Sequence, residues 1–301
     1  MSLATTLVAD VGGTNTRLAL ADENGVISGS TQRYANTAVQ GFSHAVSTYL
    51  SAQSDIKPTA MCVAIAGPVT KGHGQLTNRQ DWQFDACALS KMLSIPRVIL
   101  INDLAALGYA LPDLPPRVIH QVGGATAQNS QALIVGVATG FNVSLCQNGQ
   151  VYEAELGHAS LPSSVMDVIR AKVGGGADTF KSVESLFSGG GLENLHVLLG
   201  NAPLTAIEIT GQQNQTLALF TQALGVMCRE LTYQYMPLGG LYFNGSLARA
   251  VLEGQGAQDI AKHAAQDTAF AGRFGQVPLF LITEDTAALY GCARYLRLNP
   301  S

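Results

Sequence analysis

The sequence predicts an α/β protein made of two related domains, and three observations lead to this prediction. Apolar strand-like runs alternate along the chain with segments of helical periodicity. The stretches Leu7 to Gly25 and Ala132 to Glu155 share one pattern: an apolar strand, a glycine-containing turn and a second strand. The 301 residues, 47% of them hydrophobic, suffice for two sizeable cores. No linker rich in proline or serine separates the halves, so we expect the domains to pack closely.

The first half begins with two predicted strands joined by a tight turn over Asp10 to Asn15. The segment Glu23-Asn24-Gly25 then supplies a hairpin turn. The expected elements that follow are a helix around Phe42 to Gln53, a strand from Ala60 to Ala66 stopped by Gly67-Pro68, a strand from Arg97 to Asn102, and a helix over residues 103–111.

The second half repeats this opening, with Asn148-Gly149 as its hairpin turn. Aligning the two halves matches Gly13 with Gly140 and Asn15 with Asn142, which indicates an internal duplication. Asp10 then matches Val137, so only the first copy has a carboxylate there. Further downstream we expect helices at Glu184 to Leu199 and Thr216 to Met236, a strand, turn and helix over residues 239–254, and a strand followed by the C-terminal helix over residues 278–298.

The composition argues against several classes of function. Charged residues make up only 13% of the chain and the net charge is −4, without long runs of one sign. We therefore expect no nucleic-acid partner and no membrane-surface partner. The five cysteines are widely spaced and lack any C-x-x-C pair, which favours buried apolar thiols over a metal site. With no expected signal peptide or membrane-spanning segment, the predicted location is cytoplasmic.

The first turn, with the sequence DVGGTN, has the composition of a phosphate-binding loop. Glycines such as Gly12 and Gly13 have no Cβ and tolerate positive φ, so their backbone N–H groups can approach an anion closely. An aspartate beside such a loop would repel a bare phosphate, and Asp10 is therefore best explained by Mg²⁺ bound with a nucleotide. An ordinary capped hairpin explains the motif about equally well. The P-loop and G-x-G-x-x-G motifs are absent.

Two further groups of residues suit a sugar-binding enzyme. Asp103 follows a predicted strand and begins a helix, where it could serve as a general base, with Asn102 bonding a second hydroxyl. Capping of the helix is the simpler interpretation of an aspartate in that place. Glu155 and His158 flank a glycine, and Glu184 lies at a helix start. Carboxylates with one imidazole can bind several vicinal hydroxyls, although their spacing specifies no metal.

Six motifs in order along the chain, from ADVGGTNTRLAL to LYFNGS, resemble the bacterial ATP-dependent glucokinase family. The intervening motifs are AIAGPV with LTNRQDW, LIND, ELGH and VESLFSGGGLENL, and the resemblance spans about Leu7 to Leu296. This family belongs to the hexokinase, actin and sugar-kinase superfamily. The sequence does not resemble the repressor-related branch of bacterial glucokinases, whose cysteine-rich zinc motif it lacks.

The resemblance implies two actin-like, ribonuclease H-like domains with a ligand cleft between them. We expect a small domain of residues 1–112 plus 284–301 and a large domain of residues 113–283. It implies ATP, Mg²⁺ and glucose as ligands, transfer to the 6-hydroxyl with Asp103 as the base, and Mg²⁺ held by Asp10. The residues that match the family's nucleotide site are Ala9, Asp10, Val11, Gly12, Gly13, Thr14, Asn15, Thr139, Gly140, Gly245 and Ser246. Those that match its sugar site are Asn78, Asn102, Asp103, Glu155, His158 and Glu184.

The sequence departs from the family pattern in both loops of its second half. The second phosphate loop reads GVATG, with Ala138 where the family has glycine, and the adenosine turn has Ser246 in place of a second glycine. Leu156 also replaces a glycine in ELGH. A Cβ at a position that needs positive φ costs roughly 1 kcal/mol or more, which would weaken nucleotide binding. Two rivals therefore remain: a kinase for another hexose or amino sugar, and a sugar-binding regulator with weakened catalysis. Homodimers are common in the family, but no interface is recognisable here.

Overall fold

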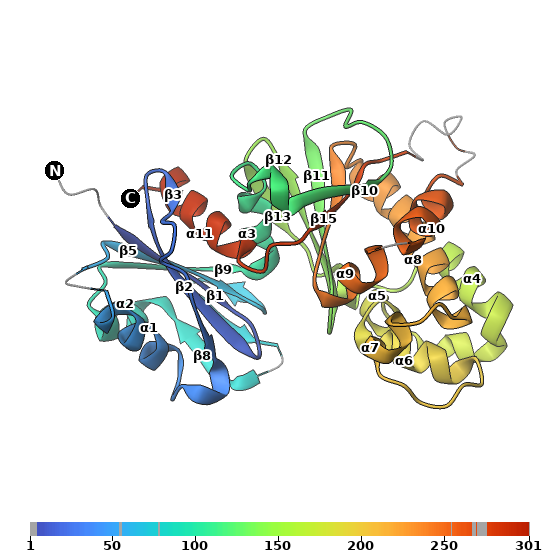
Figure 1. The fold of residues 1–301 in the computed structure, drawn as a ribbon, viewed down its shortest axis with the longest axis horizontal. Coiled ribbons are helices and arrows are strands. Elements are labelled where there is room, and N and C mark those ends of the chain that lie inside the picture. The colour runs from blue at the N-terminus through green and yellow to red at the C-terminus, as the bar shows by residue number, and fades with distance from the viewer. Residues whose placement is uncertain are drawn as a thin grey trace. The chain divides into compact units, whose positions relative to one another are not determined.

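The computed structural model describes residues 5–53, 56–77, 79–253, 255–266, 269 and 276–300. The chain divides into two compact units, and both contain a β-sheet packed with helices (Figure 1). Unit 1 comprises Met1–Leu114 and Glu284–Ser301, and unit 2 comprises Pro115–Thr283. The sequence places the boundaries after residues 112 and 283. The predicted α/β class is confirmed, with strands and helices alternating in each unit.

Unit 1 is organised around a mixed sheet with the strand order β3-β2-β1-β5-β9, in which β4 also pairs with β2. β1 is antiparallel to β2 and parallel to β5, and β5 is parallel to β9. The strands are β1 (Thr6–Val11), β2 (Asn15–Asp22), β3 (Gly25–Val26), β4 (Gln32–Ala35), β5 (Ala60–Ile65) and β9 (Arg97–Asn102). A separate small sheet, which the sequence does not predict, contains β6 (Val69–Thr70), β7 (His73–Leu76) and β8 (Arg79–Asp85).

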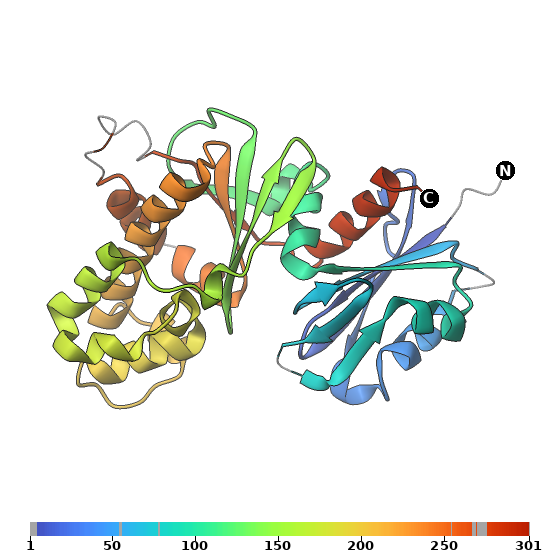
Figure 2. The same ribbon diagram turned by 180° about the vertical axis from the view of Figure 1, so that it is seen from behind.

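Helices cover both faces of the unit 1 sheet (Figures 1 and 2). On one face, α1 (Phe42–Ser51) and α2 (Ala86–Leu93) pack against a fully buried cluster that includes Leu7, Val11 and Ile65. On the other face lie α3 (Asp103–Ala110) and α11 (Ala287–Leu298), which pack against each other and against β5. Because alternate residues of β1 serve the two faces, this strand is almost entirely buried.

Unit 2 contains a six-stranded sheet with the order β10-β15-β14-β11-β12-β13. β11 is antiparallel to β12 and parallel to β14, and β14 is parallel to β15. Positive φ angles at Asn148 and Gly149 form the predicted turn between β12 and β13. The strands are β10 (Ile119–Gly123), β11 (Gln131–Val137), β12 (Phe141–Gln147), β13 (Gln150–Glu153), β14 (Gly240–Asn244) and β15 (Leu279–Ile282).

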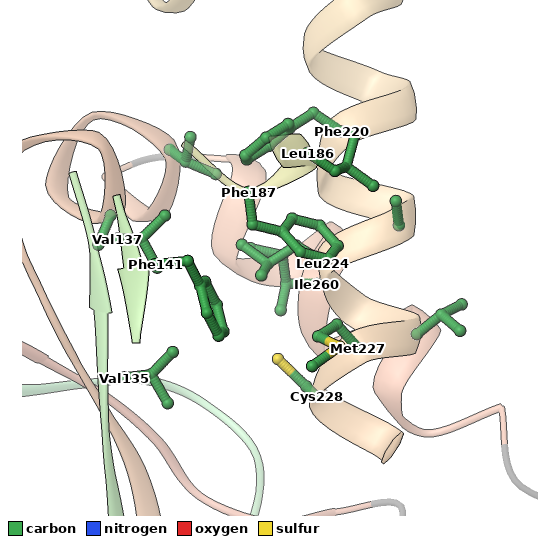
Figure 3. Packing of buried hydrophobic residues seen from close by; sticks show 14 of the residues in the cluster. Val135, Val137, Phe141, Leu186, Phe187, Phe220, Leu224, Met227, Cys228 and Ile260 are labelled. Atoms are coloured by element: carbon green, nitrogen blue, oxygen red, sulfur yellow. The ribbon is translucent and has the colours of Figure 1, made fainter. Parts of the chain in front are cut away.

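A helical layer buries one face of the unit 2 sheet, with Phe141, Phe187 and Phe220 in contact along the interface (Figure 3). The ring centroid of Phe187 lies 5.8 Å from that of Phe141 and 5.7 Å from that of Phe220. The α-helices of this unit are α4 (Ser163–Val173), α5 (Val183–Leu186), α6 (Gly189–Leu198), α7 (Ala206–Thr210), α8 (Gln215–Tyr235), α9 (Ser246–Leu252) and α10 (Gln255–Ala264). Unit 1 has one short 3-10 turn among its described residues, η1 (Asn36–Ala38). Those described in unit 2 are η2 (Pro116–Val118), η3 (Leu156–His158) and η4 (Gly174–Thr179).

The two sheets share a topology, but the residue that corresponds to Asp10 is not the one predicted. In each unit a hairpin precedes two parallel strands, so β1, β2, β3, β5 and β9 correspond to β11, β12, β13, β14 and β15. Val137 lies in the buried core with Val135, whereas Asp10 alternates with core residues and faces the opposite side of its sheet. By this alternation Gly136 takes the position of Asp10. The sequence alignment was therefore wrong by one residue, which exchanges the two faces of a strand.

Candidate active site

The first turn, residues 12–14, joins β1 to β2 at the carboxyl end of β1. Val11 pairs with Ile65, and Ile65 pairs with Asn102, so the carboxyl ends of β1, β5 and β9 lie level with one another. This register brings the first turn and Asn102 to the same edge of the unit 1 sheet, with Asp103 directly after. Ligands commonly bind at this edge in α/β proteins.

Gly12 closes the first turn by donating its N–H to the carbonyl oxygen of Asn15 at 3.0 Å. Neither Gly12 nor Gly13 has a positive φ, contrary to the reason first given for these glycines. A Cβ at Gly12 would meet only the Asn15 carbonyl oxygen, at an ordinary 3.7 Å. The described part of the protein therefore does not itself require glycine at position 12.

Asp10 forms an ion pair with Arg17, the residue directly opposite on β2. Asp10 Oδ2 accepts from Arg17 Nη1 at 2.9 Å, and both side chains are more than four-fifths buried. Burial raises the pKa of the Asp10 carboxyl, and Arg17 lowers it by less than burial raises it. The Asp285 carboxylate nearby raises the same pKa further. The Arg17 guanidinium therefore offsets only part of the effect of burial on this carboxyl.

Ala9 and Val11, which the family pattern places at the nucleotide site, are fully buried strand residues of the unit 1 core. They support the turn and present no side chain at its surface. Thr14 is exposed, and Asn15 begins β2 and accepts from Arg33 Nε at 3.0 Å.

Asn102 is the N-cap of α3, a role first considered for Asp103. Its Oδ1 accepts from the N–H groups of Leu104 and Ala105, while its Nδ2 donates to the carbonyl oxygen of Gly67 at 3.1 Å. These bonds leave one Nδ2 hydrogen for a further acceptor. Asp103 is half-buried and accepts from the N–H of Leu104 at 3.0 Å. Asn78, also expected at the sugar site, lies outside the described residues.

The second turn, residues 138–140, joins β11 to β12 and lies against Glu184 of α5. Glu184 Oε2 accepts from the N–H of Phe141 at 3.1 Å and would lie 2.4 Å from a Cβ at Gly140. The contact between the Phe141 and Phe187 rings in the core anchors both segments (Figure 3). A glycine at position 140 thus lets the carboxylate approach the turn, on which Thr139 is exposed.

Glu155 and His158 lie at the start and end of η3, beside the first residues of β12. Asn142 fixes this segment: its Nδ2 donates to Glu155 Oε2 at 3.0 Å, and its Oδ1 accepts from the N–H of Leu156 at 3.0 Å. The N–H of His158 donates to the carbonyl oxygen of Glu155 at 3.2 Å. The segments that carry Glu155, His158 and Glu184 therefore lie beside the second turn.

The backbone strain expected from the two departures of the second half is absent. The described non-glycine residues with positive φ are Lys71, Ser94, Asn148 and Met236, so neither Ala138 nor Ser246 belongs to them. The positive φ falls on Gly245, at 110°, where a Cβ would lie 2.4 Å from the Val137 carbonyl oxygen. The fold therefore requires glycine at position 245. The same close distances show that the turn between β14 and α9, which contains Gly245, lies beside the second turn.

Three residues of the site were not found from the sequence: Arg17, Asn142 and Asn36. The hairpin register could have placed Arg17 opposite Asp10, because strands joined by a short turn pair predictably. Asn142 appeared only as the counterpart of Asn15. Asn36 follows β4 and contacts the first turn across more than twenty positions of sequence, for which the sequence contains no signal.

Comparison with known proteins shows the family of this chain. The family model described as glucokinase matches residues 7–299. The chain belongs to the glucokinase family. A curated glucokinase of Photorhabdus laumondii is 30% identical over 321 residues, which cover 97% of this chain and 96% of that one. The crystal structure of a glucokinase from an Antarctic psychrotroph has 28% identity and a TM-score of 0.80, covering 99% of this chain and 100% of the other.

More distant structures share only the fold with this member of the glucokinase family. A ROK family glucokinase from Streptomyces griseus, solved with glucose and AMPPNP, is 15% identical with a TM-score of 0.62 over 98% of this chain and all of the other. The two-domain actin-like fold implied by the resemblance is thereby confirmed. Within the described residues, no helix combines the length and apolar character required to cross a membrane.

Proposed function

We propose that the protein transfers the γ-phosphoryl group of MgATP to the 6-hydroxyl of glucose, with Asp103 as the general base. Membership in the glucokinase family makes the chain a hexose kinase that phosphorylates glucose. The observation that supports the residue assignment is the level register of β1, β5 and β9, which gathers the first turn and the Asn102-Asp103 junction at one sheet edge.

Asp103 suits the role of base because it is the first residue of α3, at that edge of the sheet, and its backbone is fixed there. The Asn102 cap holds the start of α3 to Gly67, so the position of Asp103 is determined by buried bonds. As the γ-phosphorus bonds to O6 of glucose and its bond to the ADP oxygen breaks, the O6 proton passes to the Asp103 carboxylate. Catalysis of phosphoryl transfer depends chiefly on such positioning and on neutralisation of charge.

The first turn would hold the nucleotide phosphates, and Asp10 would hold Mg²⁺, whose charge neutralises phosphate oxygens during the transfer. The residues fit this ion, because Asp10 places a carboxylate at the end of β1 beside the first turn, and carboxylate oxygens are ligands that Mg²⁺ prefers. In the described chain no group of three or more histidine, cysteine or acidic side chains could hold a metal. Mg²⁺ commonly binds to one or two carboxylates together with substrate phosphates, and we expect it to bind here with the nucleotide.

The sugar would bind at the carboxylates beside the second turn. Glu184 uses one oxygen for the N–H of Phe141, and Glu155 uses one for Asn142, so each carboxylate is oriented and keeps acceptor capacity for hydroxyl groups. His158 lies on the same short turn as Glu155 and adds a ring nitrogen. Carboxylates held in this way are well suited to a polyhydroxylated ring.

The decisive experiment compares wild-type protein with Asp103→Asn in a coupled ADP-release assay with glucose and MgATP. We expect kcat to decrease by about a hundredfold or more, the usual scale for a general base, while KM for glucose changes little. An unchanged melting temperature would show that the variant is folded. Near-normal turnover in a folded variant would remove Asp103 from this role.

A panel of hexoses and amino sugars in the same assay distinguishes glucose from rival substrates. The regulator alternative depended on strain at Ala138, and no specific feature of the backbone there supports it. Binding of glucose without any ADP release would revive it. The cytoplasmic location and a homodimer stay predictions.

A further inference from the structure

Asn36 is a fully buried polar residue whose hydrogen bonds converge on the first turn. Its Nδ2 donates to the carbonyl oxygens of Gly12 at 2.8 Å and Gly13 at 3.1 Å. Its own N–H donates to the carbonyl oxygen of Thr14 at 2.8 Å. All three carbonyl groups of the turn are therefore bonded to one asparagine.

A second contact fixes the orientation of the Asn36 amide. Thr16, also fully buried, donates its hydroxyl to Asn36 Oδ1 at 2.8 Å. The carbonyl oxygens of Gly12 and Gly13 can only accept hydrogen bonds, so the amide nitrogen has to face them and the amide oxygen has to face Thr16. Asparagine supplies both functions in one plane, which neither aspartate nor serine can do.

These bonds determine which way the N–H groups of the turn point. The peptide bonds are trans, so the C=O of Gly12 and the N–H of Gly13 point in opposite directions, as do the C=O of Gly13 and the N–H of Thr14. Because Asn36 holds both carbonyls inward, both N–H groups point away from the core. Among the residues that the structure describes, neither N–H has a hydrogen-bond acceptor.

We propose that Asn36 is a positioning residue for nucleotide binding: it fixes the first turn so that the N–H groups of Gly13 and Thr14 face the phosphates of MgATP. Asn36 itself touches no substrate. A turn fixed before binding avoids the cost of ordering it in the complex, so Asn36 increases affinity for the nucleotide without affecting the sugar site. The inference rests on the proposed function for the identity of the ligand.

The test uses Asn36→Asp in the full-length protein, with MgATP binding measured by calorimetry and KM measured for both substrates. Aspartate has the same shape but places an acceptor against two carbonyl groups. We expect the Kd and KM for MgATP to rise about tenfold or more, the scale of one lost buried hydrogen bond, and KM for glucose to stay within about twofold. Thr16→Val, which frees the amide without removing it, should give a smaller shift in the same direction.

Ser30→Ala is the matched control, because Ser30 is a buried polar residue of unit 1 that braces a different turn through Ile27 and Leu20. It should lower the melting temperature without changing the Kd or KM for MgATP. If Asn36→Asp does not fold, Thr16→Val and Asn36→Ser provide the same comparison.

The outcomes separate this inference from the proposed function. Unchanged MgATP binding in folded Asn36 variants would overturn it, as would equal weakening of glucose and MgATP. A wild-type protein that binds MgATP but does not phosphorylate glucose would refute the proposed function, while the calorimetric comparison would still decide the role of Asn36. A wild-type protein that does not bind MgATP would refute both.

Discussion

The two hairpin turns occupy equivalent positions in the two units but are held in different ways. The first turn is bonded to the buried side chain of Asn36. The second is bonded through its backbone, since the N–H of Gly189 at the start of α6 donates to the carbonyl oxygen of Ala138 at 2.9 Å. The shared topology thus determines where each turn lies, while contacts specific to each unit determine how it is held.

The turns also differ in the origin of their carboxylate. The first turn has Asp10 on its own strand, paired with Arg17 across the hairpin. The second has no acidic residue on its strand, and Glu184 approaches it from α5 instead. The first turn therefore has a carboxylate fixed by its own hairpin, whereas the carboxylate at the second turn depends on how α5 packs.

The largest effect should come from Asp10→Asn, which removes the carboxylate of the first turn. We expect kcat to fall by about a hundredfold or more, as when a group that stabilises charge in the transition state is lost. Glu184→Gln is the matched change at the second turn and should instead raise KM for glucose by about tenfold. Titrations of activity with Mg²⁺ check this contrast. Melting temperatures of both variants detect any loss of stability from leaving Arg17 without its ion-pair partner. Equal Mg²⁺ dependence in both variants would contradict it.

Gly245→Ala should destabilise the fold next to the second turn. The added Cβ would lie 2.4 Å from a backbone oxygen at a φ of 110°, so we expect a loss of about 2 kcal/mol or more in the free energy of unfolding. Urea denaturation of both proteins measures it. A variant as stable as wild type would show that the backbone there can relax.

Gly12→Ala should leave stability within about 0.5 kcal/mol of wild type, because its Cβ would make only an ordinary contact. If phosphates approach the first turn closely, the same methyl group should raise KM for MgATP by about tenfold or more. Denaturation and steady-state kinetics on one preparation separate the two effects. An unchanged KM would place the phosphates elsewhere.

The smallest effect should come from Ala138→Gly, which restores the glycine of the family pattern. Because Ala138 has no positive φ, we expect KM for MgATP to change by less than about twofold. Greater freedom of the unfolded chain should lower stability by at most about 1 kcal/mol. A large gain in affinity for MgATP would show that the alanine does obstruct the nucleotide.

Local patterns predicted much of the fold, including the strands that lead into both turns and the helix that begins at Asp103. These features depend on periodicity, turn residues and capping, which act over a few positions. The small sheet β6-β7-β8 was missed, although β8 alternates exposed Asp81 and Gln83 with buried Trp82 and Phe84 and is seven residues long. Its partners β6 and β7 have only two and four residues, which is too short for a recognisable pattern. The correspondence of Asp10 with Val137 failed because identical letters in a turn do not fix strand register.

The order of residues along the chain was enough to predict the α/β class, the duplicated hairpins and the side chains that could bind sugar and phosphate. The contacts made at the two turns became clear only from the packing: Asn36 with the first turn, Glu184 with Gly140, and Asn142 with Glu155. These contacts join residues far apart in the chain, and their geometry follows from how sheets and helices pack. The glycines illustrate the distinction, since Gly12 and Gly245 look alike in sequence, yet only Gly245 is required by the protein's own backbone.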